Sequence, residues 1–451
     1  MHHYDAFAEE LGQAVLACAR DRLRLDPVPL DGPRTPEELA SSVGQTITED
    51  GLGAAALDIF ADKLAPACVS IDHPRFLSFI PCAPTEAASL FDLVVSASSI
   101  YGGSWLEGAG AVYAENQALS WIAGLAGLPP QAGGVFVSGG SIATLSALVT
   151  ARHRARSRPG GTGRRWLVAG TEQTHSSVRS ACEVMDVGFL PVPGDQRGRL
   201  TGPALRQAAA GADGEVFAVA ATAGSTNFGI VDDLAGVAQA CAELGAWLHV
   251  DGAYGLAGLA APSVRPLFDG VQQADSLVVN PHKWLFAPFD CSALLYRDPA
   301  VARAAHTQRA SYLDVLTESG DFNPSDYAIG LTRRARGLPF WFSLAAHGTR
   351  AYTAAVERTL QVARFAAAEI RRRGYLGLLH DPQLTVLVFR RVGWRAADYR
   401  AWSARLLADG FAFVVPTVHD GETVARIAVV NPRTTEADIA AILDTMAPQP
   451  A

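Results

Sequence analysis

The feature that most constrains the fold is a series of short apolar runs separated by longer stretches with helical periodicity. Strands that are buried on both faces have this pattern, because helices cover both sides of a mostly parallel sheet. The sequence therefore predicts an α/β fold with a mostly parallel central sheet. The runs lie at residues 134–137, 166–169, 216–219, 247–250, 276–279 and 292–295.

Two further units flank the predicted large domain, which we place at residues 66–345. Residues 1–65 have the spacing of short amphipathic helices, which cannot bury both faces alone. We expect this helical segment to pack on another subunit or on the large domain. Residues 346–451 begin with a long helical pattern and are expected to form a small C-terminal α/β domain. Its apolar runs lie at 384–389, 411–415 and 426–430.

Composition argues against several classes of protein. The formal net charge of -8 argues against nucleic-acid binding through a basic surface. The six cysteines are scattered without CxxC pairs or matching histidine spacing, which indicates reduced thiols and predicts no metal site. The N-terminus lacks the pattern of a secretory signal, and no uncharged apolar run reaches the roughly 18 residues needed to cross a bilayer. We therefore expect a cytoplasmic protein without membrane contact.

Lys283 lies in an apolar setting, directly after the run at 276–279 and between Pro281 and Trp284. Lysine prefers water, so this position requires a reason. Desolvation lowers the pKa of an amine and frees its lone pair, which allows it to form a Schiff base with a carbonyl. The alternative is a lysine whose chain only extends past the core to solvent.

Asp251 follows the run at 247–250, which places it at the carboxyl edge of the sheet, where α/β folds bind ligands. Such a carboxylate can cap a helix. Facing a pyridine nitrogen, it would keep that nitrogen protonated and make a pyridoxal ring an electron sink. Ala253, two residues on, is small enough for a flat ring to lie against it.

A glycine-rich turn follows the run at 134–137 and leads into a helix through Gly139, Gly140 and Ser141. Free amides at a helix N-terminus together with a hydroxyl suit a phosphate, although such turns are often only structural. The pattern Gly139-x-Ser141-x-Ala143 also resembles a degenerate nucleophile elbow. It keeps open an α/β hydrolase that uses Ser141.

Two more turns after apolar runs carry polar side chains. His175 is either a hydrogen-bonded loop residue or an imidazole stacked on a cofactor ring. Thr226 either caps the next helix or contacts cofactor and substrate. Neither turn decides between these alternatives by itself.

In their order along the chain, these motifs resemble the group II pyridoxal-phosphate decarboxylases, the family of aromatic amino acid and glutamate decarboxylases. The resemblance extends from about His73 to Trp341. It implies the fold of the aspartate aminotransferase-like (fold type I) PLP-dependent transferases, pyridoxal 5'-phosphate as cofactor, and a homodimer with active sites at the interface. The matching segments are Ser-Gly-Gly-Ser at 138–141, His-Ser-Ser-Val at 175–178, His-Val-Asp-Gly-Ala-Tyr at 249–254, Asn-Pro-His-Lys-Trp at 280–284 and Phe-Asp-Cys-Ser at 289–292.

The resemblance also implies a role for each site residue. Lys283 would bind the cofactor aldehyde, Asp251 would pair with the ring nitrogen, and His175 would stack on the ring opposite Ala253. Thr226 would lie beside the cofactor. The implied phosphate contacts are Gly140, Ser141, Asn280 and His282.

Tyr312 corresponds to a catalytic tyrosine that protonates the substrate α-carbon after carbon dioxide has left. Members with phenylalanine there resemble aldehyde synthases, so this tyrosine favours plain decarboxylation. The sequence thus predicts a decarboxylase that converts an L-amino acid to an amine and carbon dioxide. An aldehyde synthase or an aminotransferase on the same fold is the alternative.

The region implied to bind the substrate side chain departs from the family pattern. Gly103 stands where the family has a bulky ring, which predicts open space there. The aromatic residues nearby would suit an aromatic or apolar substrate. The candidate pocket residues are Phe79, Pro81, Cys82, Tyr101, Gly103 and Trp105.

Overall fold

A seven-stranded sheet forms the centre of the structure, a computed structural model that describes residues 2–159, 165–309, 311 and 321–448. The strand order is β1-β7-β6-β5-β4-β2-β3. Only β7 is antiparallel to its neighbours within this sheet, which confirms the predicted mostly parallel α/β fold. The strands are β1 Gly133–Val137, β2 Trp166–Gly170, β3 Gly188–Pro191, β4 Glu215–Thr222, β5 Trp247–Asp251, β6 Ser276–Val279 and β7 Ser292–Tyr296.

The edge strand β3 was not among the predicted strands. It has four residues, and none of them is fully buried. It therefore lacks the fully buried apolar run by which the other strands were recognised, the opposite edge strand β1 included.

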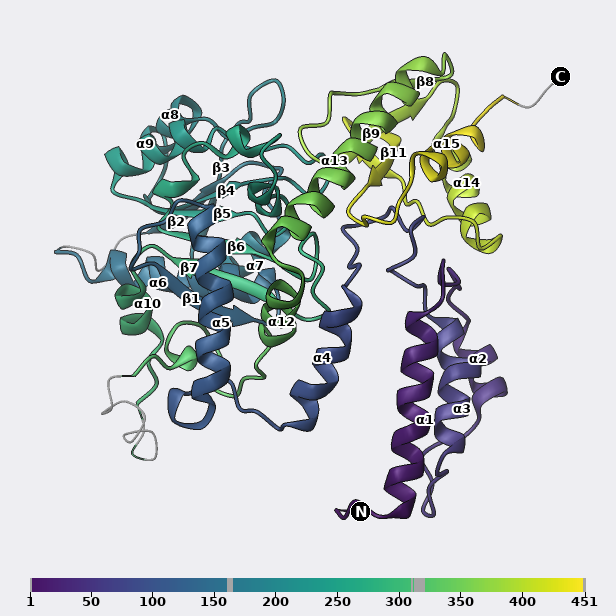
Figure 1. Ribbon diagram of the computed structural model, residues 1–451. Coiled ribbons are helices and arrows are strands. Elements are labelled where there is room, and N and C mark those ends of the chain that lie inside the picture. The colour runs from purple at the N-terminus through teal and green to yellow at the C-terminus, as the bar shows by residue number, and fades with distance from the viewer. Residues whose placement is uncertain (1, 160–164, 310, 312–320, 449–451) are drawn as a thin grey trace.

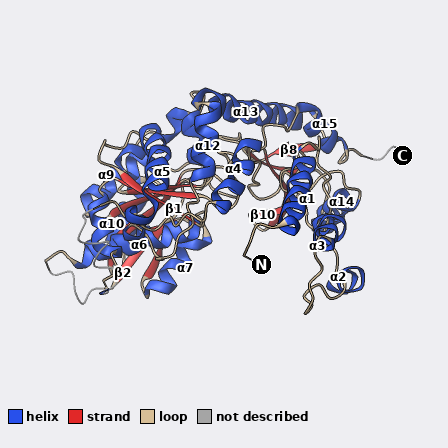
Figure 2. Ribbon diagram, turned by 60° about the horizontal axis from the view of Figure 1, so that its bottom comes forward, coloured by secondary structure: helices blue, strands red, loops and turns tan. Residues whose placement is uncertain are grey.

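Helices cover both faces of this sheet (Figures 1 and 2). One face carries α6 Gly140–Arg156, α7 Ser176–Met185 and α10 Pro299–His306. The other face carries α5 Trp105–Leu125, α8 Gly202–Ala210, α9 Leu234–Leu244 and α12 Leu338–His347. Short 3-10 helices follow β5: η3 Gly255–Ala260, η4 Arg265–Phe268 and η5 Val271–Gln273, and η7 Pro324–Asp326 lies before α12.

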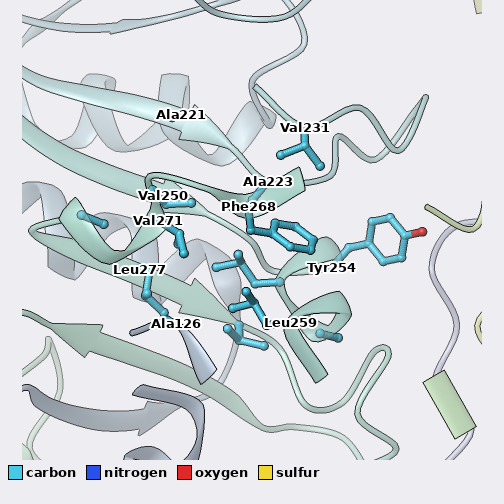
Figure 3. Packing of buried hydrophobic residues seen from close by; sticks show 14 of the residues in the cluster. Ala126, Ala221, Ala223, Val231, Val250, Tyr254, Leu259, Phe268, Val271 and Leu277 are labelled. Carbon is cyan, nitrogen blue, oxygen red and sulfur yellow. The ribbon is translucent and has the colours of Figure 1, made fainter. Parts of the chain in front are cut away.

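The alternation of side chains along β5 decides which residues face which layer. Leu248 and Val250 belong to the core on the α5 and α9 side, where Val250 packs near Leu277 (Figure 3). Trp247 belongs to the core on the α6 side. Since successive side chains of a strand point to opposite faces, His249 and Asp251 also lie on the α6 side.

The C-terminal part forms a second core around a four-stranded antiparallel sheet in the order β10-β11-β9-β8. The long helix α13 Thr349–Arg372 connects it to the large sheet, as Figure 1 shows. Its other elements are β8 Leu376–Leu378, β9 Val386–Arg391, α14 Ala396–Ala408, β10 Thr417–His419, β11 Glu422–Ala428 and α15 Glu436–Asp444.

The apolar run at 411–415 does not form a strand of the C-terminal sheet. This segment makes a single parallel bridge, from Phe413 to Phe76. Its backbone bonds with the segment before α4: Leu77 N donates to Phe413 O at 2.9 Å, and Phe413 N donates to Arg75 O at 3.0 Å. A distant part of the chain thus uses the hydrogen bonds that a sheet neighbour would have taken.

The N-terminal helices stand beside the rest of the molecule, next to α4 Glu86–Ala97 (Figure 1). They contain no buried residue, as expected for a segment that does not pack on its own large domain. Packing on another subunit stays a prediction. The elements are α1 Ala6–Leu23, α2 Pro36–Val43, α3 Ala55–Ile59, η1 Phe60–Leu64 and η2 Ala65–Ala67.

Within the described ranges, the structure contains no helix that is both long enough and apolar enough to span a membrane.

A buried carboxyl group connects α5 to α12. Glu115 in α5 is almost fully buried, and its Oε1 accepts the Gly337 amide at 2.6 Å at the start of α12. Burial raises the pKa of Glu115 to about 7, against the opposing influence of the Gly337 amide and of the Arg333 and Arg336 charges. The unfolded chain, with an ordinary glutamate pKa, loses this proton at lower pH than the folded protein does.

We therefore expect Glu115→Gln to change the pH dependence of stability. Between about pH 4.5 and 7 the folded wild type holds a proton that the unfolded chain has released, so its stability falls as pH rises and then levels off. Gln keeps the acceptor for Gly337 but does not titrate. The free energy of unfolding of the variant relative to wild type should rise by roughly 2–3 kcal/mol from pH 4.5 to 7.5, at about 1.4 kcal/mol per pKa unit. Urea unfolding at each pH measures this difference. A difference in unfolding free energy that stays constant from pH 4.5 to 7.5 would contradict the assignment.

Candidate active site

A cavity of about 210 Å³ lies at the carboxyl edge of the large sheet, where parallel strands place ligands. The site residues predicted from sequence at this edge come together here, with the exception of His282. The lining residues are Gly140, Ser141, Gln173, His175, Ser177, Thr222, Gly224, Thr226, Asp251, Ala253, Tyr254, Asn280 and Lys283.

The register of three neighbouring strands brings the polar groups of the cavity together. Thr222, the last residue of β4, is the Cα partner of Asp251, the last residue of β5. Asp251 is in turn the partner of Val278 in β6. Two residues after Val278, the chain reaches Asn280, whose carbonyl accepts the Lys283 amide at 2.9 Å. One row of strand ends therefore supplies a hydroxyl, a carboxylate, an amide and an amine.

Asp251 is buried, and its Oδ1 accepts the Ala253 amide at 3.1 Å. This bond folds the chain back after β5 and places the Ala253 methyl group in the cavity wall. A Cβ at Gly252 would lie 2.0 Å from Leu256 Cγ, so Leu256 fills the space that a larger residue at 252 would need.

Lys283 is half-buried in the turn after β6. Burial lowers the pKa of its amine, while the charge of Asp251 opposes this shift. A lowered amine pKa increases the fraction of the neutral, nucleophilic form at neutral pH. The chain has only two lysines among its 37 basic residues, and the other, Lys63, is exposed in η1.

His175 caps the N-terminus of α7. Its Nδ1 lies 2.8 Å from Ser177 Oγ and accepts the Ser177 amide at 3.2 Å. These two contacts fix the orientation of the ring, which lines the cavity. No histidine among the described residues hydrogen-bonds Ser141, so the nucleophile–base pair that a serine hydrolase requires is not formed there.

The phosphate residues implied by the resemblance fall into two groups. Gly140 and Ser141 begin α6, whose amides have no side-chain cap, and a Cβ at Gly140 would lie only 3.1 Å from Asn280 Nδ2. His282 does not line the cavity. Its Nδ1 accepts the Cys291 amide at 3.0 Å, and burial lowers its pKa to about 4.

The cavity fits pyridoxal 5'-phosphate by the chemistry of its walls. It offers an amine for the aldehyde at Lys283, a carboxylate for the ring nitrogen at Asp251, and free helix amides for the phosphate at Gly140. Thr222 Oγ1 is buried at the same wall and has no hydrogen-bond partner among the described residues. A bound polar molecule would satisfy this hydroxyl.

Five residues of the cavity were missed by the sequence reasoning. Thr222 ends a strand but is a common residue type, and the other four adjoin recognised motifs without a signal of their own. They are Gln173, Ser177, Thr222, Gly224 and Tyr254.

The predicted substrate-pocket residues do not line this cavity within one chain. The predicted open space at Gly103 is wrong, because a Cβ there would lie 2.4 Å from the Tyr101 ring. Tyr101 takes this place and donates its hydroxyl to Leu331 O at 2.9 Å.

The other pocket candidates are dispersed. Pro81 and Cys82 are buried, and the Cys82 thiol donates to Ala287 O at 2.9 Å. Trp105 is the first residue of α5, and its amide donates to Asn323 Oδ1 at 2.9 Å. Phe79 is 60% exposed. Tyr312 lies outside the described residues.

Arg426 of β11 was also missed. Its buried guanidinium donates to Thr226 O at 2.6 Å and to Phe79 O at 2.9 Å. Burial lowers its pKa to about 10. This side chain joins the C-terminal sheet to the Thr226 turn of the cavity and to the segment that carries Phe79.

The comparison with known proteins decides the family. The model of the pyridoxal-dependent decarboxylase conserved domain matches residues 41–392. The chain belongs to this family. It is 29% identical over 423 residues to the aromatic-L-amino-acid decarboxylase of Bacillus atrophaeus, covering 90% of this chain and 87% of that protein. It is 31% identical over 412 residues to the L-2,4-diaminobutyrate decarboxylase of Rhizobium meliloti (strain 1021), covering 88% and 81%.

Solved structures agree with this assignment. The crystal structure of Oryza sativa TDC with PLP and tryptamine is 26% identical, with a TM-score of 0.87 and coverage of 98% of this chain and 97% of that one. Mouse CSAD, at 23% identity and a TM-score of 0.89, shows the same fold over 98% of both chains. The predicted fold, cofactor and decarboxylase class are thus confirmed, and the chain is a pyridoxal-phosphate-dependent carboxy-lyase.

The presence of only two lysines makes the attachment site directly testable. Borohydride reduction after addition of pyridoxal phosphate should attach the cofactor to the peptide that contains Lys283, because its amine has the lowered pKa. Lys283→Ala should abolish the attachment and steady-state turnover, whereas the control Lys63→Ala should keep both. Peptide mass spectrometry reads the position. Cofactor found on Lys63, or retained in Lys283→Ala, would refute the assignment.

Proposed function

We propose that this protein decarboxylates an L-amino acid with an aromatic or apolar side chain to the amine and carbon dioxide. The proposal is carried by one observation: an amine of lowered pKa, Lys283, shares a cavity with the carboxylate of Asp251. Named relatives act on aromatic amino acids and on diaminobutyrate, and the first of these supports the side-chain class.

Each wall of the cavity would have a defined task. Lys283 would hold the cofactor through its aldehyde. Asp251 would keep the ring nitrogen protonated, so that the ring could accept electrons. His175 and Ala253 would lie against the flat ring. The amides of α6 at Gly140 and Ser141, which have no side-chain cap, would hold the phosphate.

The cofactor supplies a conjugated, electron-accepting system, and the orientation of the substrate decides which bond breaks. The resemblance implies that Tyr312 would donate a proton to the α-carbon, so amine should be the product. An aldehyde synthase would release aldehyde and ammonia, and an aminotransferase would release a keto acid. Product identity therefore separates the three activities.

We expect a panel of L-amino acids to give amine and carbon dioxide in equal amounts, with aromatic substrates the best. Asp251→Asn should lower kcat/KM by about 10³-fold or more, because a neutral amide does not hold the ring nitrogen protonated. Carbon dioxide release and chromatography of the products measure both. Keto acid or aldehyde as the main product, or an Asp251→Asn protein of wild-type activity, would contradict the proposal.

We further propose a homodimer, supported by an apolar stripe on α4 and the neighbouring α5. Leu90, Leu93 and Val94 recur at helical spacing on α4 and are each about half exposed. Leu106 and Tyr113 of α5 add exposures of 66% and 60%. Exposed apolar side chains at helical spacing on a surface helix favour an interface. The N-terminal helices beside α4 have no core of their own and would clasp the partner.

Leu93→Glu should convert the dimer to monomers or weaken it at least tenfold, because it places a charge within the apolar stripe. Val184→Glu, a change at a 73% exposed site on α7, is the matched control and should leave the dimer intact. Sedimentation velocity at several concentrations measures the outcome. A monomeric wild type, or a Leu93→Glu protein that stays dimeric, would argue against this interface.

A further inference from the structure

A chain of buried polar groups lies beneath the active site, between β5, β6 and α6. Trp247 Nε1 donates to Ser276 Oγ at 2.8 Å, and Ser276 Oγ lies 2.9 Å from His249 Nδ1. His249 and Ser276 are direct partners across the two parallel strands. All three side chains are almost completely buried. The cavity-lining residues do not include any of them.

The indole of Trp247 determines which groups donate and which accept in this series of hydrogen bonds. An indole N–H can only donate, so it takes one lone pair of the Ser276 oxygen. Among the described residues, His249 Nδ1 is the acceptor left for the Ser276 hydroxyl proton. Nδ1 therefore accepts, and the proton of the neutral imidazole resides on Nε2. Burial lowers the pKa of His249 to about 4, so the ring is neutral at physiological pH.

The proton-bearing end of the ring has no partner among the described residues: His249 Nε2 is buried and not hydrogen-bonded. An N–H group in this position is costly unless an acceptor lies within its reach. His249 and Asp251 are two residues apart on β5, so both side chains lie on the α6 face of the sheet. The charge of Asp251 acts on the His249 ring and favours its protonated form.

We propose that His249 is a positioning residue that directs its Nε2–H at the carboxylate of Asp251 when the cofactor is bound. Ser276 and Trp247 fix the tautomer that makes this possible. The Ala253 amide donates to Oδ1 of Asp251 at 3.1 Å. The carboxylate is then held between two donors and keeps its charge toward the ring nitrogen. This inference rests on the proposed pairing of Asp251 with the cofactor.

The test is the affinity of the apoprotein for pyridoxal phosphate, measured by the visible absorption of the bound cofactor. The amide nitrogen of Gln reaches the place of Nε2, whereas Asn reaches only that of Nδ1. His249→Asn should therefore raise the Kd about tenfold, and His249→Gln should stay within about threefold of wild type. Rescue by Gln distinguishes a directed N–H from mere filling of space.

The roles of Trp247 and Ser276, which do not contact Asp251 in the proposal, are tested by further substitutions. Trp247→Phe frees the Ser276 hydroxyl to reverse its direction and should raise the Kd about threefold. Trp402→Phe removes an indole bond of the same 2.8 Å length, to Thr445 in the C-terminal core, and should leave the Kd unchanged. Ser276→Ala removes the hydroxyl but leaves the imidazole in place. It therefore tests whether Ser276 fixes the His249 tautomer, even if His249→Asn folds poorly. We expect about threefold weaker binding.

Several outcomes would overturn the proposal. His249→Asn and Ser276→Ala proteins that bind cofactor like wild type would do so. Equal losses in the Asn and Gln variants, with equal drops in Tm, would show that the ring only fills space. In an Asp251→Asn background, His249→Asn should add no further loss, and an additional tenfold loss would contradict the coupling. Failure of wild type to bind the cofactor at all would instead reject the proposed function, and this inference with it.

Discussion

The parallel alignment of β4, β5 and β6 is the constraint on which the site depends. Because the three strands end side by side, Thr222 lies opposite Asp251 and Asp251 lies opposite Val278, just before the turn that carries Lys283. Sliding one strand by a single residue would turn Asp251 to the opposite face of the sheet. The apolar residues that alternate with the polar ones are locked into two separate cores, so this register is fixed by packing on both faces.

Helix α13 and the segment just before β9 support the neighbours of Asp251 and Lys283. Tyr254, three residues after Asp251, stacks on Trp284, the neighbour of Lys283, at a centroid distance of 5.3 Å. Figure 3 shows the Tyr254 hydroxyl directed away from the apolar cluster. There it accepts the Thr385 amide at 2.9 Å, while Trp284 Nε1 donates to Thr359 at 2.8 Å. The separation between carboxylate and amine is thereby tied to contacts made by elements far along the chain.

The sequence predicted the position of a residue correctly where a local pattern, such as a buried strand, fixed that position. Asp251 ends a buried strand and Lys283 lies in the turn after the next one, so their place at the sheet edge could be inferred. Thr222 has the same position but a common residue type, and nothing marked it. The space at Gly103 was misjudged because the ring of Tyr101, two residues away, folds back over it. The run at 411–415 is apolar, yet it pairs with a segment more than 300 residues earlier, which no local pattern reveals.

The distribution of basic residues adds a chemical reason for selectivity. A guanidinium stays protonated at every physiological pH and does not attack an aldehyde, whereas an amine does so once it loses its proton. With 37 basic residues and only two lysines, nearly all positive charge of this chain is carried by arginine. Burial in the cavity lowers the pKa of Lys283, which increases the fraction of the neutral amine relative to an amine in water. Composition leaves Lys63 as the one competing side-chain amine, and the fold lowers the pKa of the amine at the site.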